Sequence, residues 1–592
     1  MSEAQEFKYI GQRTIRPDGF DKVTGRATYG ADLTLPGMIW GKTLRSPHAH
    51  AKILSIDTSK AEAHPDVMSV ATFKDFVTLQ SESAAGTEGA ASVLDVARNC
   101  LADDKVLYHG HAIAAIAARS ERAAKDALGL IEVKYELLPP VLDVEDAMKE
   151  DSPVLHDDMF TAGYDEKPSK ASNIATRVEM KMGDVEAGFA EADIIVEREF
   201  RTPTAHQGYI EPHACTVTYD ENGQSMVWCC TQGHFDVRTL TAKVLGMELG
   251  KLKVIASEIG GGFGGKTVIY QEPVALVLSK KSGRPVKMVM DREEVFIATG
   301  PTSAAKLKAK VGVKKDGTIT AMQGWMAYEA GAFKGSPMVP GVMTMFTPYD
   351  CPNVLVEGFD VVVNKSKVAA YRAPGAPQAE YAAEMVVNEL AEKLGMDPID
   401  LRLKNAAKEG TQTIYGPKLK RVGLVECLEA AKNSPHYQSA LPEGQGRGLA
   451  SGFWFNIGGQ SSVSVNMNPD GTGTIVEGSP DIGGSRASMQ MMAAEVLQIE
   501  PKNLKPIIAD TENLPYSQGT GGSRTTFATG MAVIEASEKV VAQVKERAAA
   551  VWNVTAEQVE YADGVARNTA GEDSMTLAEV CKNAEKTGGQ IS

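Results

Sequence analysis

A glycine run with a single interruption constrains the fold of this 592-residue chain more than any other feature. Residues 260–267 read Gly-Gly-Gly-Phe-Gly-Gly-Lys-Thr. We predict a strand before them, over residues 252–259, and a helical apolar run after them, over residues 268–278. Because glycine has no Cβ, the backbone here can adopt left-handed conformations and approach a ligand closely.

The same eight residues satisfy the Walker A pattern, in which backbone N–H groups at a helix N-terminus bind phosphate. In that interpretation Lys266 contacts the terminal phosphates, Thr267 binds magnesium, and the protein is a P-loop NTPase. A P-loop needs only Gly260 and Gly265, and each surplus glycine costs conformational entropy. A structural turn without a ligand is another alternative, and the loop alone leaves these interpretations open.

Composition narrows the class of protein. The sequence has 61 Lys and Arg against 76 Asp and Glu, a net charge of −15, which disfavours binding to nucleic-acid phosphates. No apolar run is long enough to cross a bilayer, and the first residues lack the basic and apolar regions of a signal peptide. We therefore expect a cytoplasmic protein with no membrane span.

The seven cysteines form no CxxC pair, so the sequence predicts neither a zinc nor an iron–sulfur site in this chain. Cys229 and Cys230 are adjacent, and on a strand their side chains point to opposite faces. We expect the cysteines to be buried, reduced thiols. If the function releases electrons, another subunit has to carry them.

Turn-rich stretches divide the chain into three segments, 1–155, 156–420 and 421–592, which we expect to be domains. Strands and helices mix in each, which predicts an α+β fold rather than a regular barrel. We expect Pro398 to end the helix of the second segment. The periodicity predicts strands within 105–118, broken at Gly110, and at 461–465 and 472–476, and helices at 119–129, 239–246, 378–394, 489–497 and 532–549.

Three further segments carry polar residues among glycines or prolines. They are residues 231–233 (Thr-Gln-Gly), residues 370–378 (Ala-Tyr-Arg-Ala-Pro-Gly-Ala-Pro-Gln) and residues 519–526 (Gly-Thr-Gly-Gly-Ser-Arg-Thr-Thr). Alone, each has an ordinary explanation: a strand-end amide, a salt-bridged arginine or a flexible loop. Together with residues 260–267, and in this order, they resemble the molybdenum-binding subunit of the xanthine dehydrogenase/aldehyde oxidase family. Residues 11–33 resemble the opening domain of that family, so the resemblance spans essentially the whole chain.

The resemblance implies an N-terminal α/β hammerhead-like domain followed by two elongated molybdopterin-binding domains, the second incomplete. It implies a molybdopterin, in bacterial members commonly the cytosine dinucleotide, whose dithiolene sulfurs hold the molybdenum without a protein ligand. Partner subunits would carry [2Fe–2S] clusters and FAD. The residues that it implies for cofactor binding are Gln232, Gly262, Phe263, Gly264, Arg372, Gly521, Gly522, Ser523 and Thr525.

Elementary chemistry suits those roles. The Gln232 amide, the one catalytic group that we assign in this chain, can donate a hydrogen bond to an oxygen on the metal. The guanidinium of Arg372 is a planar fork that suits an anionic pterin or phosphate group. Backbone N–H groups and hydroxyls around Gly522 suit the dinucleotide phosphates. His206, Glu211 and His213 lack a standard metal-ligand spacing, and we expect them to be structural or to support the site.

The chain departs from the purine-oxidising members in its expected substrate pocket. Thr267 replaces a glutamate, Pro374 replaces a stacking phenylalanine, and an arginine is missing near Pro340. A purine is therefore disfavoured, and an aromatic, N-heterocyclic or aldehyde substrate, or an aroyl thioester, is expected. Besides Thr267 and Pro374 we expect Phe455 to line this pocket, although aromatic residues such as Trp454 and Phe455 are more often core residues.

Two departures concern the cofactor and the chemistry. Residues 482–485 read Ile-Gly-Gly-Ser where relatives have Gly-Gln-Gly, so a side-chain amide is absent and Ser485 or Arg486 has to substitute for it. Family members also carry a C-terminal Gly-x-Gly-Glu segment whose glutamate is the general base. The chain stops at Ser592 before such a segment, so we expect a second molybdopterin subunit or a truncated chain.

The sequence therefore predicts a subunit of a molybdenum hydroxylase, which inserts a water-derived oxygen and passes electrons to Fe–S and FAD partners. The reverse chemistry, as in the aroyl-thioester reductases of the same family, is one alternative. A P-loop NTPase and a non-catalytic scaffold that keeps the fold are the others.

Overall fold

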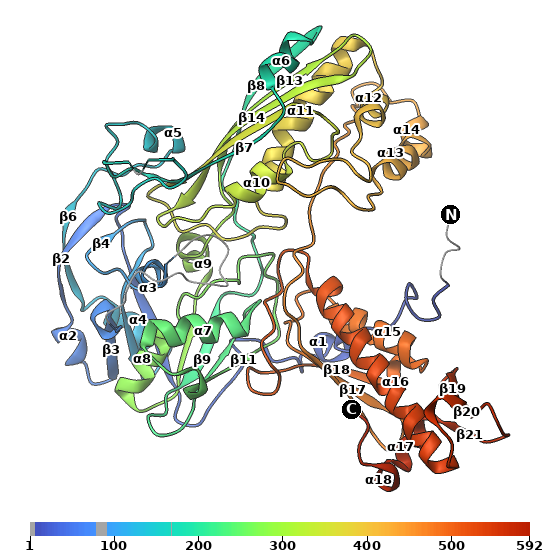
Figure 1. Cartoon of the computed structure of the whole chain (residues 1–592). Helices are drawn as coiled ribbons and strands as arrows, with labels where there is room; N and C mark the ends of the chain where they lie inside the picture. Colours follow the sequence, from blue (N-terminus) through green and yellow to red (C-terminus); the bar gives the residue numbers. More distant parts are fainter. Residues whose placement is uncertain (1–5, 78–91, 167) are drawn as a thin grey trace.

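The computed structural model describes residues 6–77, 92–166 and 168–592. Figure 1 shows three bodies, with the third (orange to red) joined to the others through a narrow waist. In the described residues no helix is both long and apolar enough to cross a membrane.

The first body is a seven-stranded mixed sheet in the order β11-β10-β9-β12-β1-β5-β3. Strand β1 pairs in parallel with β12, so the N-terminal segment and the one that follows share a single sheet. Strand β5 has the sequence AIAAIAA and is buried on both faces. The side chains of β5 alternate between a core under α3, α7 and α8 and a second core under α4. Because both faces of β5 are covered, the strand consists of small apolar residues.

The elements of this body are as follows: β1 (Ile39–Arg45), β3 (Val67–Thr72), α3 (Val93–Cys100), β5 (Ala112–Ala118), α4 (Glu121–Leu128), β9 (Ala214–Thr218), β10 (Ser225–Cys229), α7 (His234–Leu245), β11 (Leu252–Ala256), α8 (Glu272–Ser282), β12 (Val286–Val289) and α9 (Arg292–Ala298). A three-stranded sheet lies in the same part of the chain, formed by β2 (Ala51–Asp57), β4 (Lys105–Val106) and β6 (Glu132–Leu137), with α2 (Ser59–Glu62) between β2 and β3.

The second body is a long five-stranded sheet, β7-β15-β14-β13-β8, which packs against α10 and α11. In β13 the alternation of Ala305, Leu307 and Ala309 with lysines puts one face in the core and the other towards solvent. The elements of this body are α5 (Val144–Ala147), β7 (Ile174–Met182), α6 (Val185–Ala190), β8 (Ile194–Thr202), β13 (Ala305–Val313), β14 (Ile319–Gly331), α10 (Met338–Thr344), β15 (Val354–Val362), α11 (Ala376–Leu394), α12 (Pro398–Asn405), α13 (Leu424–Lys432) and α14 (Pro435–Gln438).

The third body packs α15 and α16 on a three-stranded sheet, β16-β17-β18. The N-terminal arm crosses to it, because Glu495 of α15 accepts the backbone N–H groups of Lys8, Tyr9 and Ile10 at 2.7–3.1 Å. Its elements, with α1 of that arm, are α1 (Gly19–Val23), β16 (Val463–Met467), β17 (Gly473–Glu477), α15 (Ser485–Leu497), β18 (Leu504–Ile508), α16 (Gly530–Trp552), β19 (Val559–Ala562), β20 (Val565–Asn568), β21 (Ser574–Thr576), α17 (Leu577–Lys582) and α18 (Ala584–Thr587).

Most predicted elements are confirmed, but several boundaries are wrong. The strand before the glycine run ends at Ala256, and the helix after it begins only at Glu272, so no helix starts at Thr267. Helix α7 begins at His234, five residues earlier than predicted. Pro398 does not end α11; Gly395, at φ +64°, ends it, and Pro398 begins α12 behind the Asp397 cap.

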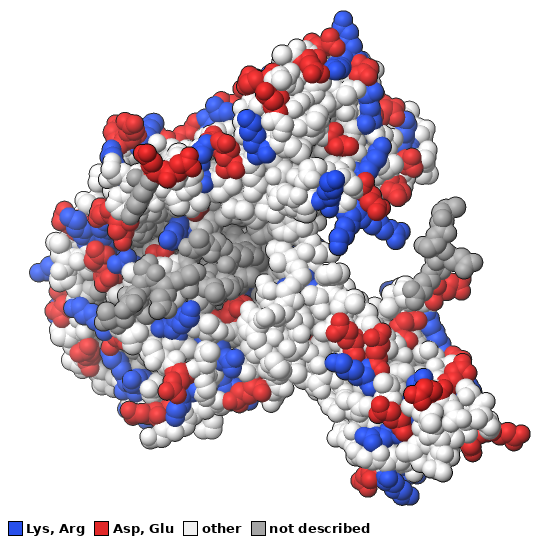
Figure 2. Space-filling view, in the orientation of Figure 1, with Lys and Arg blue, Asp and Glu red and all other residues white. Residues whose placement is uncertain are grey.

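The cysteines follow the prediction with one exception. Six are buried and all seven are free, but Cys427 on α13 is exposed. On the face shown in Figure 2, acidic and basic side chains are interspersed over all three bodies, and the waist is largely uncharged.

Candidate cofactor and substrate site

Gln232 lies between β10 and α7, and its buried side chain joins two of the loops that the sequence singled out. Its Oε1 accepts the Gly264 N–H at 2.9 Å, and its Nε2 donates to the Thr520 carbonyl oxygen at 2.7 Å. Its own carbonyl accepts the Thr520 N–H at 2.7 Å. A Cβ at position 262 would lie 2.4 Å from Oε1, so any larger residue there would displace the Gln232 amide. One amide therefore fixes residues 260–267 against residues 519–526.

The loop at residues 370–375 closes on the same place. The Arg372 N–H donates to the Phe263 carbonyl oxygen at 3.0 Å. A Cβ on Gly264 would lie 2.5 Å from the Ala370 carbonyl oxygen, and Gly264 has φ +107°, so glycine is required here as well. The structure thus brings together three of the predicted loops around Gln232.

These loops concentrate unusual backbone conformations. Phe263, Arg372, Ala373 and Ser523 all have positive φ, at 55°, 21°, 57° and 58°. They are four of the seven non-glycine residues with positive φ in the described part of the chain. Such conformations are costly and cluster at ligand-binding sites, which marks this convergence as a functional site.

The P-loop interpretation of residues 260–267 is wrong. The ammonium group of Lys266 lies 2.6 Å from Glu211 Oε2, its side chain is fully enclosed, and that of Glu211 is 9% exposed. The Thr267 hydroxyl donates to the Gly264 carbonyl oxygen at 2.8 Å. Binding phosphate would break a buried ion pair, and no helix N-terminus lies behind the loop to receive it.

His206, Glu211 and His213 have structural partners. Glu211 also accepts the Gly260 N–H at 2.8 Å, and His213 Nε2 bonds the Tyr209 hydroxyl at 2.8 Å. Burial lowers the pKa of His213, which keeps the ring neutral. His206 Nε2 bonds the Thr299 hydroxyl at 2.9 Å. Among the described residues no group of three His, Cys, Asp or Glu could hold a metal ion.

Several polar groups in these loops and in neighbouring segments have no partner within the described protein. The exposed Arg372 guanidinium makes no hydrogen bond or ion pair to the described residues. The Thr525 hydroxyl, the Ser485 hydroxyl and Gln207 Oε1 are buried without a hydrogen-bond partner in the described structure. Thr525 begins a π-helical turn that leads into α16, a feature frequent at functional sites. The guanidinium and the two hydroxyl groups can donate to an anionic ligand such as a pterin with phosphates, and Gln207 Oε1 can accept from an N–H group of the ligand.

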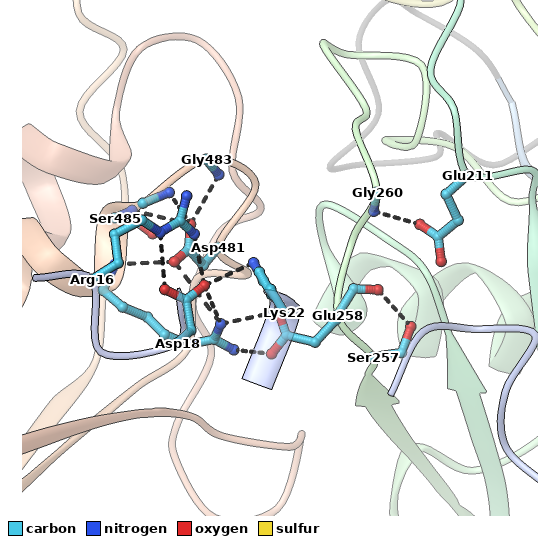
Figure 3. Close-up of polar contacts among 12 residues, drawn as sticks. Arg16, Asp18, Lys22, Glu211, Ser257, Glu258, Gly260, Asp481, Gly483 and Ser485 are labelled. Atoms are coloured by element: carbon cyan, nitrogen blue, oxygen red, sulfur yellow. Dashed lines mark hydrogen bonds and ion pairs between the residues drawn. The ribbon is translucent and has the colours of Figure 1, made fainter. Parts of the chain in front are cut away.

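Asp481 fixes the segment Ile-Gly-Gly-Ser at residues 482–485, which stands where relatives have Gly-Gln-Gly (Figure 3). The Asp481 carboxylate accepts the backbone N–H groups of residues 483–486 at 2.6–3.2 Å. Burial alone would raise the pKa of Asp481, but these N–H groups and Arg486 lower it. Arg486 is itself paired with Glu258 at 2.8 Å. Of the two residues expected to replace the missing amide, Arg486 is therefore engaged and the Ser485 hydroxyl is unpartnered.

An ionic network extends this contact to the N-terminal arm. Asp18 pairs with Arg16 at 2.6 Å and with Lys22 at 2.7 Å, and Lys22 also lies 3.1 Å from Glu258. Glu258 precedes the glycine run and lies beside Lys22 in Figure 3. Arg486, in the first turn of α15, pairs with Glu258 at 2.8 Å. The arm, the glycine loop and the third body are thereby held together at the site.

A pocket of about 300 Å³ with a mainly apolar lining opens beside these loops. Thr267, Pro374 and Gly522 line it. Phe455 does not; its ring stacks on Trp454 with centroids 4.7 Å apart, and Trp454 lines the pocket instead. Sequence reasoning also missed Phe333, whose only signal was its place in a glycine- and proline-rich stretch.

Comparisons with known proteins agree with this arrangement. Residues 24–139 match the family model described as the aldehyde oxidase and xanthine dehydrogenase a/b hammerhead domain. Residues 166–406 and 427–592 match two models, each described as a molybdopterin cofactor-binding domain.

Several curated proteins are similar over most of the chain. The probable hypoxanthine oxidase XdhD of Escherichia coli K12 is 30% identical over 96% of this chain and 64% of its own length. The carbon monoxide dehydrogenase large chain of Afipia carboxidovorans is 30% identical over 94% of this chain and 73% of its own length. The nicotinate dehydrogenase large molybdopterin subunit of Eubacterium barkeri is 34% identical over 72% of this chain and 96% of its own length. The chain thus spans less than two thirds of the length of XdhD.

Solved structures share the fold. The reconstituted CO dehydrogenase from Oligotropha carboxidovorans superposes with a TM-score of 0.84 at 26% identity, over 98% of this chain and 76% of that one. The aldehyde oxidoreductase from Desulfovibrio gigas superposes with a TM-score of 0.80 at 28% identity, over 90% of this chain and 59% of that one.

Proposed function

Because the chain belongs to the aldehyde oxidase and xanthine dehydrogenase family of molybdopterin-binding proteins, we propose that it forms the cofactor-binding part of a molybdenum hydroxylase. The enzyme oxidises an aromatic, N-heterocyclic or aldehyde substrate with oxygen from water. Electrons then pass to partner subunits that carry [2Fe–2S] clusters and FAD.

The observation that carries this proposal is the convergence at Gln232. Its amide fixes two glycine loops at 2.9 Å and 2.7 Å, and Thr267 and Gly522 of these loops line an apolar pocket. When bound, the molybdenum–pterin supplies the two-electron chemistry that amino-acid side chains lack.

Each group of residues has a separate task in this proposal. Arg372 and the hydroxyl groups of Thr525 and Ser485 bind the anionic parts of the pterin, because their donors have no partner within the described protein. Gly262 and Gly264 let the backbone approach, while Phe263, Gly522 and Ser523 present N–H groups from left-handed backbone. Gln232 keeps a second Nε2 hydrogen for an oxygen at the reacting centre.

The finer features of the enzyme are also part of the proposal. Thr267 and Pro374 line the pocket in place of purine-binding residues, which supports a substrate other than a purine. The pterin is the cytosine dinucleotide form. The general-base glutamate belongs to a partner molybdopterin subunit. Relatives described as a large molybdopterin subunit and as one subunit of a dehydrogenase complex support a multi-subunit enzyme.

A matched pair of glutamine variants tests the proposal. Gln232→Ala removes both loop contacts, whereas Gln438→Ala changes an exposed glutamine on α14. We expect natively purified Gln232→Ala, with its copurifying chains, to lose most of its pterin and its activity while staying folded, and Gln438→Ala to retain both. Equal pterin content and activity in the two variants would contradict the proposed site.

A further inference from the structure

The substrate pocket contains an aromatic residue in an unexpected place. Pro374 stands where a stacking phenylalanine is expected, and the aromatic residues among the described lining are Phe333 and Trp454. Trp454 belongs to an irregular segment, residues 449–460, which lies between the α11 anchors and the glycine loop at 519–526. We call this segment the strap.

The strap is anchored to α11 on one side of Trp454. The Phe453 N–H donates to Glu380 Oε1 at 2.6 Å, and the Ser451 N–H donates to Glu384 Oε2 at 2.5 Å. Glu384 is in turn held by Arg402, whose guanidinium lies 2.7 Å away. The contact to Glu384 is buried and charge-assisted, and contacts of this kind are strong, so the backbone before Trp454 is fixed.

On the other side the strap is anchored to the cofactor loop. The Ile457 N–H donates to the Gly522 carbonyl oxygen at 3.0 Å, and Arg524 Nε donates to the Gly458 carbonyl oxygen at 3.0 Å. The Phe455 ring covers Trp454 at 4.7 Å with an interplanar angle of 17°. The indole is therefore held from both ends and backed by a second ring, which preorganises it for a ligand.

The indole N–H has no partner. Trp454 Nε1 is buried without a hydrogen-bond acceptor in the described structure, and so is the hydroxyl oxygen of Ser336, which lines the same pocket. Leaving a buried donor unpaired is costly, and the indole N–H can only donate. A ligand with an acceptor atom would satisfy it.

The charges of the pocket limit the ligand further. Its charged lining residues are Asp95, Asp360 and Lys367, so carboxylates outnumber ammonium groups. Asp360 is already occupied by the N–H groups of Gly335 and Ser336, at 2.8 Å each. An ionised carboxylic acid would be repelled by this excess of carboxylates, whereas a neutral molecule would not be repelled. The volume of about 300 Å³ lies at the small end of ligand pockets.

We propose that Trp454 is the specificity-determining residue of this pocket, an assignment that rests on the proposed function. It selects a small, neutral, flat heteroaromatic substrate, which lies against the indole and accepts a hydrogen bond from Nε1 through a ring nitrogen or a carbonyl oxygen. Ser336 supplies a second donor to the same class of molecule.

Isoquinoline and naphthalene test this assignment, because they share a shape and differ by one ring nitrogen. Binding of each is measured by equilibrium dialysis to the natively purified complex and to its Trp454→Phe variant, which keeps an aromatic face but loses the donor. We expect the wild type to bind isoquinoline about tenfold more tightly than naphthalene. In Trp454→Phe that preference disappears, while naphthalene binding stays within about twofold.

Molybdenum content of the same samples separates the two proposals. If the metal is present and Trp454→Phe retains the preference for isoquinoline, the role of Trp454 is wrong and the proposed function stands. If the metal is absent but the preference depends on Trp454, the pocket assignment stands and the proposed function fails. A wild type that does not prefer isoquinoline overturns the Trp454 proposal in either case. Ser336→Ala, which should reduce the preference by a smaller factor, guards against a folding defect at Trp454.

Discussion

The ammonium group of Lys266 lies 2.6 Å from the Glu211 carboxylate, and this ion pair forms the base of the glycine loop. Glu211 also accepts the Gly260 N–H at 2.8 Å, and the ammonium lies 5.0 Å from the centre of the Tyr209 ring. The residue that makes the loop resemble a phosphate-binding motif therefore holds the loop in shape. Its charge is neutralised within the protein.

Replacement of Lys266 by alanine should destabilise the protein rather than abolish nucleotide binding. It leaves the Glu211 carboxylate enclosed and unpaired, so we expect the free energy of unfolding to fall by about 3–5 kcal/mol in chemical denaturation. Lys52→Ala breaks an exposed pair with Glu136 and should cost less than about 1 kcal/mol. Saturable ATP binding by the wild type that Lys266→Ala removes would contradict this account.

Gly264→Ala should impair cofactor retention more than stability. The new Cβ would collide with the Ala370 carbonyl oxygen at a position with φ +107°, so the loops around Gln232 would separate. Gly283→Ala is the matched control, because Gly283 also has positive φ, +63°, but nothing lies within 4 Å of its added Cβ. We expect each of the two variants to lower the free energy of unfolding by about 1 kcal/mol or more. Only Gly264→Ala should lose the pterin, which is measured by its fluorescence after extraction.

Asp481→Ala should loosen the junction of the third body. Four backbone N–H groups lose their acceptor, so we expect a loss of about 2 kcal/mol in the free energy of unfolding and faster proteolysis near residue 484. Asp481→Asn keeps one acceptor oxygen for these groups and should cost less. Equal stability of Asp481→Ala and the wild type would contradict this role of the N–H contacts.

The buried carboxyl of Glu477 predicts a pH dependence of stability. Burial raises its pKa from 4.5 to about 8, so the folded state retains a proton that the unfolded state releases. Its stabilising effect is complete below pH 4.5 and is lost as the pH rises towards 8, by roughly 2–4 kcal/mol. Glu477→Gln should reduce the pH dependence of the denaturation midpoint across this window, whereas Glu560→Gln, on the exposed side of β19, should leave it unchanged. A pH dependence as steep in Glu477→Gln as in the wild type would contradict the assignment.

The sequence predicted what depends on local pattern. The alternation in β16 and β17 and the long periodicity of α11 are properties of neighbouring residues, and the elements formed there. The end of α11 was misassigned because Gly395 and Pro398 are both stop signals, and the left-handed cap at Gly395 acts first.

Contacts between distant residues could not be predicted in the same way. Glu211 and Lys266 are 55 residues apart, so only the folded chain reveals that the lysine is neutralised. Phe455 and Trp454 are adjacent in an irregular strap with no periodicity to assign their directions. Their roles are decided by anchors on α11 and at Gly522, both remote in sequence.

The most direct test of the central claim is the molybdenum content of the natively purified protein, measured by mass spectrometry of the metal together with identification of the chains that copurify. The account predicts close to one molybdenum per chain, bound with a pterin and accompanied by partner subunits. A complete native complex that contains neither molybdenum nor pterin would contradict it.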